Sequence, residues 1–150
     1  MTTPHETHPP RFVQLGEVFS STYQLTPENV RRFANAAEDH NPLHHDSLYA
    51  MDTRFGGLIA SGTQIVSLFM GLTATHYSEA RLQPLGLEFD VKLRKAAMAH
   101  DLIALRWVVT DAYFKESLEG DIVTLEGTVK NEGGDTLVAG TSKLLVMERV

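Results

Sequence analysis

An aspartate and a histidine stand five positions apart in the segment Asp39-His40-Asn41-Pro42-Leu43-His44. A carboxylate and an imidazole held on one rigid turn can take up and release a proton near neutral pH. Histidine titrates near pH 6.5 without perturbation, and partial desolvation can raise the pKa of a carboxylate such as Asp39 towards neutrality. The segment therefore predicts acid–base chemistry shared by Asp39 and His44.

Pro42 makes this turn rigid. Its ring fixes its own φ and disfavours the helical region for Asn41, so a helix arriving from upstream should end at about Asp39. The Asn41 side chain can tie the turn to nearby backbone or orient one of the two functional groups. Covalent acyl transfer has no obvious nucleophile, because the chain contains no cysteine and no serine in a G-x-S-x-G elbow.

Two other interpretations of the segment are open. The pair Asp39 and His44 could form a structural turn with a surface ion pair. His40, His44 and His45 with Asp39 and Asp46 could also suggest a metal site. Their spacing does not place ligands on a single helix face and cysteine is absent, so we predict no metal.

Length and composition limit the class of protein. A chain of 150 residues is large enough for one domain with a real core. The net charge of −6 and the scattered Lys and Arg residues argue against a nucleic-acid partner. The lack of cysteine fits the reducing cytoplasm, which we predict as the compartment. The longest apolar run, Ile65 to Leu72, is too short to span a bilayer, so no membrane is expected.

Residues 1–11 are rich in Thr, Pro and His and lack an apolar stretch, so we expect a disordered tail and no signal peptide. The domain should then occupy residues 12–150. The sequence Thr26-Pro27-Glu28 opens a helix that should run to about Asp39. A short helix is predicted from Asp46 to about Thr53.

A third helix should run from Ser61 to about Tyr77. Ser61 and Gln64 have the spacing of a capping box, which predicts that Ser61 caps this helix. The helix is apolar nearly all round, a pattern typical of a buried helix.

The hydrophobic period changes to two after Pro84. Leucine, phenylalanine and valine alternate with polar residues from Leu85 to Leu93, which predicts a strand with one core face and one wet face. Further strands are predicted at 18–25, 102–111, 122–130 and 137–147, the last two joined by a turn at 131–135, while 111–121 is interpreted as a loop. The predicted class is α+β, with an antiparallel curled sheet against one buried central helix.

The turn Asp39-x-Asn41-Pro42-Leu43-His44, followed by the helix entry from Phe55-Gly56-Gly57 to Ser61-Gly62, resembles the MaoC-like dehydratases and (R)-specific enoyl-CoA hydratases. The resemblance runs from roughly Gly16 to Val146. It implies a single hotdog domain, in which a sheet wraps a long central helix, and a homodimer or higher homo-oligomer with the active site near the subunit interface. It also implies reversible hydration of 2-enoyl-CoA to 3-hydroxyacyl-CoA in fatty acid metabolism. No cofactor is implied, because CoA is part of the substrate.

The resemblance assigns roles to individual residues. Asp39 and His44 match the catalytic pair that activates a water, and Asn41 matches a residue that helps orient the site. Gly62 matches the glycine whose N–H binds the thioester carbonyl. Free N–H groups at the start of a buried helix fit that role independently.

This chain departs from the family at several positions. Glu38 and Ser61 stand where relatives often carry glycine and histidine. Met70 replaces an often small residue, so it should limit acyl chain length if it points into the acyl pocket; it is otherwise a core residue. The predicted substrate-binding residues are thus Asn41, Ser61, Gly62 and Met70. The segment Lys95 to Asp101 lacks the Gly and Pro found in relatives.

Basic residues near this segment, Lys92, Arg94 and Lys95, either contact CoA phosphates or are simply solvated. Two alternative functions also remain: a hotdog acyl-CoA thioesterase, and a non-catalytic subunit that binds an acyl thioester.

Overall fold

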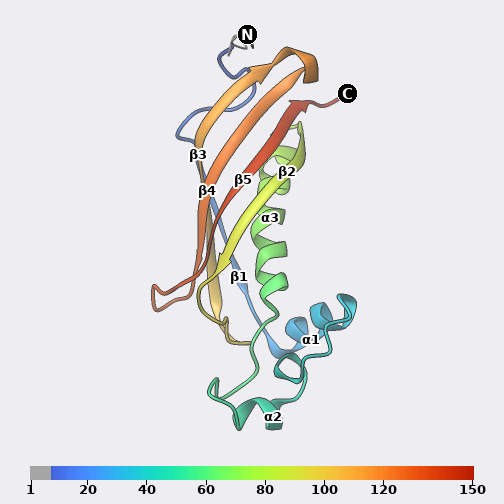
Figure 1. Cartoon of the computed structure of the whole chain (residues 1–150), viewed down its shortest axis with the longest axis vertical. Coiled ribbons are helices and arrows are strands. Elements are labelled where there is room, and N and C mark those ends of the chain that lie inside the picture. The colour runs from blue at the N-terminus through green and yellow to red at the C-terminus, as the bar shows by residue number, and fades with distance from the viewer. Residues whose placement is uncertain (1–7) are drawn as a thin grey trace, which may run out of the picture.

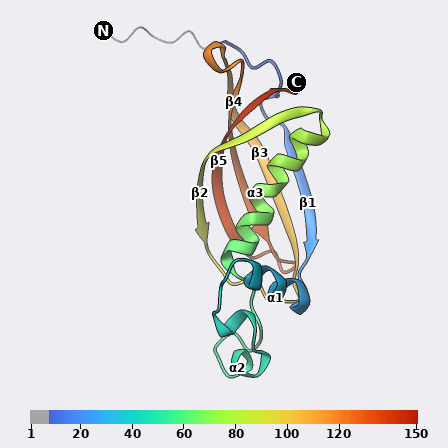
Figure 2. The same cartoon turned by 90° about the vertical axis from the view of Figure 1, so that its right-hand side faces the viewer.

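The computed structural model describes residues 8–150. The elements follow one another as β1 (Val18–Gln24), α1 (Pro27–Ala36), the 3₁₀ helix η1 (Pro42–His44), α2 (Ser47–Met51), α3 (Gly62–Glu79), β2 (Leu82–Leu93), β3 (Leu102–Lys115), the 3₁₀ helix η2 (Glu116–Leu118), β4 (Gly120–Lys130) and β5 (Thr136–Glu148). The strands form one antiparallel sheet in the order β1-β3-β4-β5-β2. The long helix α3 lies across the concave face of this sheet, between β1 and β2 (Figures 1 and 2). The predicted α+β architecture is confirmed.

A stacked pair of rings joins α3 to the sheet. Trp107 on β3 stacks on Phe69 of α3 with centroids 3.8 Å apart, and the indole N–H donates to the Phe69 carbonyl at 2.8 Å. The sheet makes room for the rings with glycine: Trp107 pairs with Gly127, and Gly127 pairs with Gly140. A Cβ on Gly127 would lie 2.5 Å from the Trp107 ring. The stacked rings and the two glycines of the sheet that lie against them therefore set how closely α3 approaches the strands.

The first helix begins as the sequence predicts. Thr26 accepts a hydrogen bond from the Asn29 N–H, and the Asn29 side chain accepts one from the Thr26 N–H, which completes a capping box. The helix ends at Ala36, slightly before the predicted end. Glu38 follows with a left-handed φ of 56°, a conformation that favours glycine. Asp39 is thereby placed just beyond the helix.

The prediction of a loop at 111–121 is wrong. β3 continues to Lys115, and η2 leads directly into β4, so the segment forms the closed end of the β3–β4 hairpin. A β-bulge between Val109 and Asp111 shifts the register by one residue. The bulge interrupts the alternation of buried and exposed side chains, which hid the strand from a period-two analysis.

The central helix is less covered than predicted. One face of α3 carries the buried residues Ile65, Phe69 and Tyr77, whereas Ser67 and Gly71 on another face are exposed. The prediction that α3 is buried on all sides is therefore wrong for the single chain. No helix within the described part of the chain is long and apolar enough to cross a membrane.

The edge strand β2 is also only partly buried. Phe89 and Val91 pack against the core, but Leu85, Leu87 and Leu93 are 48%, 47% and 60% exposed. The strand lies at the end of the sheet, so one side of its backbone has no neighbour among the described strands. Leu85 pairs with Leu145 and Phe89 pairs with Ser142, three residues apart on β5, so these two β2 side chains lie on opposite faces of the sheet. The prediction of a single core face from Leu85 to Leu93 is therefore wrong, because a β-bulge between Gly86 and Glu88 shifts the register.

The segment before β1 is anchored by a buried carboxylate. Asp121, which is fully buried at the start of β4, accepts hydrogen bonds from the backbone N–H groups of Arg11, Phe12 and Val13 at 2.7–3.1 Å. His8 forms a β-bridge with Phe114. Of the tail predicted at 1–11, residues 1–7 lie outside the described residues, and residues 8–11 lie against the β3–β4 hairpin.

Candidate active site

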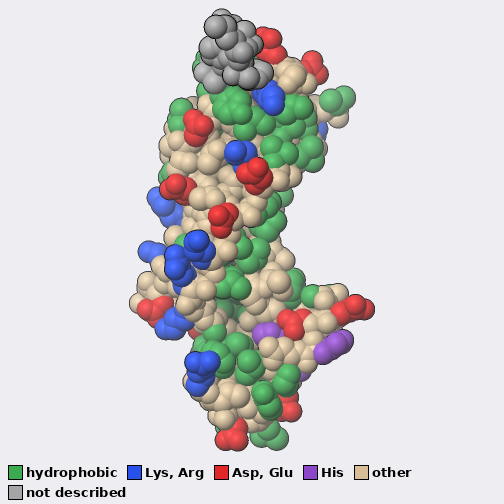
Figure 3. All heavy atoms as spheres, viewed as in Figure 1, with side chains coloured by type: hydrophobic (Ala, Val, Ile, Leu, Met, Phe, Trp, Pro, Cys, Tyr) green, Lys and Arg blue, Asp and Glu red, His purple; other side chains and the backbone are tan. Residues whose placement is uncertain are grey.

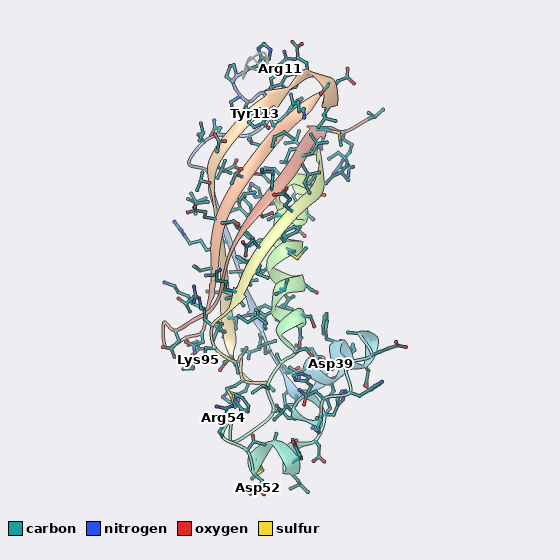
Figure 4. The ribbon with its side chains drawn as sticks, in the orientation of Figure 1. Arg11, Asp39, Asp52, Arg54, Lys95 and Tyr113 are labelled. Atoms are coloured by element: carbon teal, nitrogen blue, oxygen red, sulfur yellow. The ribbon has the colours of Figure 1, made fainter. Side chains whose placement is uncertain are left out.

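The structure brings Asp39 and His44 side by side at the N-terminal end of α3. Asp39 Oδ2 lies 3.3 Å from His44 Nε2. The His44 side chain is 7% exposed and that of Asp39 is 32% exposed, so solvent reaches the pair from the Asp39 side. Figure 4 shows Asp39 and Lys95 at this end of the molecule and Arg11 and Tyr113 at the other. The catalytic role of the pair stays a prediction.

Asn41 holds the turn between the two residues. Its side-chain Oδ1 accepts a hydrogen bond from the Leu43 N–H at 3.1 Å and caps η1. Its backbone N–H donates to Asp39 Oδ1 at 3.2 Å. The exposed side chain of Asn41 is therefore engaged in the turn, and only its backbone contacts the carboxylate.

A backbone carbonyl sets the tautomer of His44. The Nδ1 atom lies 2.8 Å from the Ile59 carbonyl oxygen. A carbonyl oxygen can only accept a hydrogen bond, so Nδ1 carries the proton. The Nε2 atom of a neutral His44 then presents a lone pair beside Asp39.

Ser61 contacts the carboxylate as well. Its hydroxyl is buried and donates to Asp39 Oδ2 at 2.9 Å. The predicted capping box is wrong, because Ser61 makes no side-chain hydrogen bond to its helix and the Gln64 amide approaches Asn29. The first N–H groups of α3 are therefore not capped by this side chain, and an α-helix leaves them without internal partners.

Hydrogen bonding lowers the pKa of Asp39. The largest cause is the Asn41 N–H, followed by the Ser61 hydroxyl; partial burial opposes them, and the rings of His44 and His45 add smaller favourable contributions. Asp39 is therefore a carboxylate at neutral pH. The possibility raised by the sequence, a pKa shifted towards neutrality, is wrong.

His44 and Gly62 line a pocket of about 290 Å³. Its wall is largely apolar, with Phe55, Ile65 and Val138 among its residues. A Cβ on Gly62 would lie 2.6 Å from the end of the Leu93 side chain, so a larger residue here would displace that leucine. The pocket provides an apolar space directly beside the uncapped helix end.

Met70 does not lie among the residues that line this pocket. It is half-buried two turns farther along α3. The structure thus groups Asp39, His44, Asn41, Ser61 and Gly62, and leaves Met70 apart.

Two contacts were missed by the sequence analysis. These are the hydrogen bond from His44 to the Ile59 carbonyl and the hydrogen bond from Ser61 to Asp39. Neither is indicated by a residue type or by a spacing in the sequence. The one available hint was the position of Ser61 directly before Gly62. Within residues 8–150, no group of three or more His, Asp or Glu side chains is arranged to hold a metal ion.

Residues 13–117 match the family described as the MaoC like domain, a range that contains the turn, the start of α3 and the pocket glycine. The chain belongs to this MaoC-like family. A curated relative, a UPF0336 protein from Thermobifida fusca (strain YX), is 28% identical over 133 residues that cover 83% of this chain and 84% of the relative. Its name states no activity.

Solved structures of a hydratase and a dehydratase share the fold. The (R)-hydratase from A. caviae involved in PHA biosynthesis superposes with a TM-score of 0.78 at 24% identity, covering 92% of this chain and 98% of that one. A chain of the C-terminally truncated HadBC (3R-hydroxyacyl-ACP dehydratase) complex from Mycobacterium tuberculosis superposes with a TM-score of 0.72 at 17% identity. The superposition covers 91% of this chain and 99% of that one. This MaoC-like chain therefore has the hotdog fold of hydratases and dehydratases.

Proposed function

We propose that this MaoC-like chain catalyses the reversible hydration of 2-enoyl-CoA to 3-hydroxyacyl-CoA. The observation that carries the proposal is the convergence of two hydrogen-bond acceptors, Asp39 Oδ2 and His44 Nε2, 3.3 Å apart. They lie next to an uncapped helix end and an apolar pocket. Such a site can hold a water, a thioester carbonyl and an acyl chain together.

The fixed tautomer of His44 suits the binding of water. With Nδ1 donating to Ile59, the imidazole and the Asp39 carboxylate are both acceptors. One water can donate a hydrogen to each, which leaves its lone pairs free to attack C3 of the enoyl group. Orientation of this kind removes much of the entropic cost of bringing water to the substrate.

His44 is the better proton carrier of the two. Because the pKa of Asp39 is lowered, its carboxylate is a weak base. In the proposed step the water oxygen bonds to C3, the π electrons move towards the thioester oxygen, and the water proton passes to His44 Nε2. The adjacent carboxylate stabilises the imidazolium, which then gives the proton to C2.

The start of α3 stabilises the thioester oxygen. Negative charge develops on that oxygen as the enolate-like transition state forms. The Gly62 N–H and the positive end of the helix dipole favour this charge, and the absence of a side chain permits close approach. In other oxyanion sites one such donor contributes about 3 kcal/mol.

We also propose that the protein forms a homodimer through β2. The exposed Leu85, Leu87 and Leu93 lie on an edge strand whose outer backbone groups can pair with a second chain. Hydrophobic side chains extend along the β2 and α3 side in Figure 3. A two-fold axis at this edge would pair β2 with its copy and cover these leucines.

The activity is tested by adding the purified protein to crotonyl-CoA. We expect loss of the enoyl-thioester absorbance and formation of 3-hydroxybutyryl-CoA without release of free thiol. Release of CoA from crotonyl-CoA or a saturated acyl-CoA would indicate a thioesterase instead. No change with short, long and branched enoyl-CoAs would overturn the proposal and favour a non-catalytic subunit.

A further inference from the structure

Both ends of the segment that carries Asp39 and His44 are tied to α1. The Asp39 N–H, at the start of the segment, donates to the Ala34 carbonyl at 2.8 Å. The His45 carbonyl, at its end, accepts a hydrogen bond from Arg31 Nε at 3.0 Å. Arg31 and Ala34 are three positions apart in α1, so they lie on the same side of the helix. One face of α1 therefore holds the turn at two points.

The His45 ring closes the segment on itself. Its Nε2 atom lies 2.6 Å from the Asp39 carbonyl oxygen. Because a carbonyl oxygen can only accept a hydrogen bond, His45 carries a proton on Nε2, whether the ring is neutral or charged. His44 carries its proton on Nδ1 instead. The two neighbouring imidazoles thus differ in role: His44 presents a lone pair beside the Asp39 carboxylate, and His45 donates to the Asp39 backbone.

The half-buried Arg31 side chain is committed to this segment. Besides the His45 carbonyl, its guanidinium contacts the first residue of α2, where Nη2 donates to Ser47 Oγ at 2.9 Å. Arg31 forms no ion pair with any residue that the structure describes, whereas its exposed neighbour Arg32 pairs with Glu28 at 3.0 Å. The donors of a guanidinium have fixed directions, so Arg31 sets the position of the segment relative to α1.

The distance between the reacting side chains depends on this backbone. The His44 ring is fixed on its far side by the Ile59 carbonyl, so a shift of the Asp39 backbone would alter the separation of 3.3 Å between Asp39 Oδ2 and His44 Nε2. A misplacement of about 1 Å can reduce a catalytic rate on the order of 100-fold.

We propose that Arg31 and His45 are positioning residues that hold Asp39 at its distance from His44; the inference rests on the proposed function for the reaction that this distance serves. Neither residue lies among those that line the pocket beside Gly62. Arg31 and His45 therefore act through the turn and not through contact with the acyl group.

The kinetic test compares two adjacent arginines in the hydration of crotonyl-CoA. We expect Arg31→Ala to lower kcat about tenfold or more and to leave KM unchanged, because the turn is loosened and the pocket is not. Arg32→Ala removes the same charge from the next position of α1 and should keep wild-type kcat. An unchanged kcat in Arg31→Ala, or an equal loss of kcat in both variants, would overturn the proposal.

Two amides test the hydrogen bond of the His45 ring. A glutamine can place an N–H donor at about the position of the histidine Nε2, whereas the asparagine side chain is too short to reach the Asp39 carbonyl. We expect His45→Gln to keep most of the wild-type kcat and His45→Asn to lose about tenfold. His40→Asn, at an exposed histidine of the same segment, is the control. Equal kcat in the two His45 variants would overturn the role of this hydrogen bond.

A third measurement separates this inference from the proposed activity. Hydrogen bonds from the Asn41 N–H and the Ser61 hydroxyl lower the pKa of Asp39, and they require an aligned carboxylate. Loosening of the turn should therefore raise the pKa of Asp39 in Arg31→Ala but not in Arg32→Ala, as followed by NMR titration of the Asp39 carboxyl carbon. This titration needs no turnover, so it remains informative if wild type hydrates no enoyl-CoA. An Asp39 pKa that is the same in Arg31→Ala and wild type would overturn the proposal even if the protein is an active hydratase.

Discussion

The Ser61 hydroxyl donates to Asp39 Oδ2 at 2.9 Å, so the residue that begins α3 holds the carboxylate rather than capping its own helix. One hydrogen bond thereby has two consequences. It helps to keep the pKa of Asp39 low, and it leaves the first N–H groups of α3 available to a ligand.

Removal of this hydroxyl should shift the pH dependence of activity. Ser61→Ala takes away the second-largest cause of the lowered pKa of Asp39, so the folded-state pKa moves up. The ionised carboxylate then persists over a narrower range, and kcat/KM at acid pH falls further below its neutral value than in wild type. Ser67→Ala changes an exposed serine on the same helix and should leave the profile unchanged. Coincident acid limbs in Ser61→Ala and wild type would contradict this role of Ser61.

A methyl group at Gly62 should impair activity more than folding. The new Cβ meets only the end of the exposed Leu93 side chain, which can rotate away. The same methyl group enters the space beside the helix N–H groups, so we expect Gly62→Ala to reduce kcat/KM by at least about tenfold. Thermal unfolding should change little. Gly71→Ala, at an exposed helical glycine with open space around it, is the control. Full activity of Gly62→Ala would contradict a ligand at this helix end.

Loss of the buried carboxylate at β4 should destabilise the fold. Asp121→Ala leaves the N–H groups of Arg11, Phe12 and Val13 without their acceptor. We expect a loss of about 3 kcal/mol in the free energy of unfolding, measured with urea. Asp111→Ala, at an exposed position on β3, should have little effect. The specific activity of folded Asp121→Ala should stay near wild type, because Arg11 and Asp39 lie at opposite ends of the molecule (Figure 4). Equal stability of the two variants would show that Asp121 is no anchor.

A charge on the apolar edge should separate the proposed dimer. Leu87→Glu places a carboxylate in the middle of β2, where pairing with a second chain would bury it. Sedimentation velocity should show a dimer for wild type and a monomer for this variant. Leu118→Glu alters a similarly exposed leucine in η2 and should remain dimeric. A wild-type monomer, or a dimeric Leu87→Glu, would exclude this interface.

Local signals in the sequence were sufficient for most of the fold. Thr26, Pro27 and Asn29 specify the start of α1 through contacts within four residues, and alternation specifies the strands away from their bulges. The segment 111–121 was missed because one extra residue at the bulge reverses the side-chain period. The exposure of α3 and β2 in the single chain was missed as well. An apolar pattern indicates that a face of a helix or strand is to be buried, but it does not indicate whether the same chain or a second chain buries it.

The sequence predicted the turn that carries the candidate site, but it did not predict the direction of the pKa shift of Asp39. Pro42 and the spacing of Asp39 and His44 indicated that the two side chains share one turn. The direction of the Asp39 pKa depends on hydrogen bonds from the Asn41 backbone and from Ser61, which is 22 positions away. The capping-box spacing predicted that the Ser61 side chain bonds to its own helix, whereas in the folded chain its hydroxyl donates to Asp39.

The most direct test of the account is the rate of crotonyl-CoA hydration by Asp39→Asn and His44→Ala beside wild type and His40→Ala. The His40 control removes an exposed histidine from the same turn, and circular dichroism checks that all four proteins fold. We predict near-wild-type hydration by His40→Ala and a loss of at least about 100-fold in the other two. Substantial hydration by either Asp39→Asn or His44→Ala would contradict the assignment of these two residues as the catalytic pair.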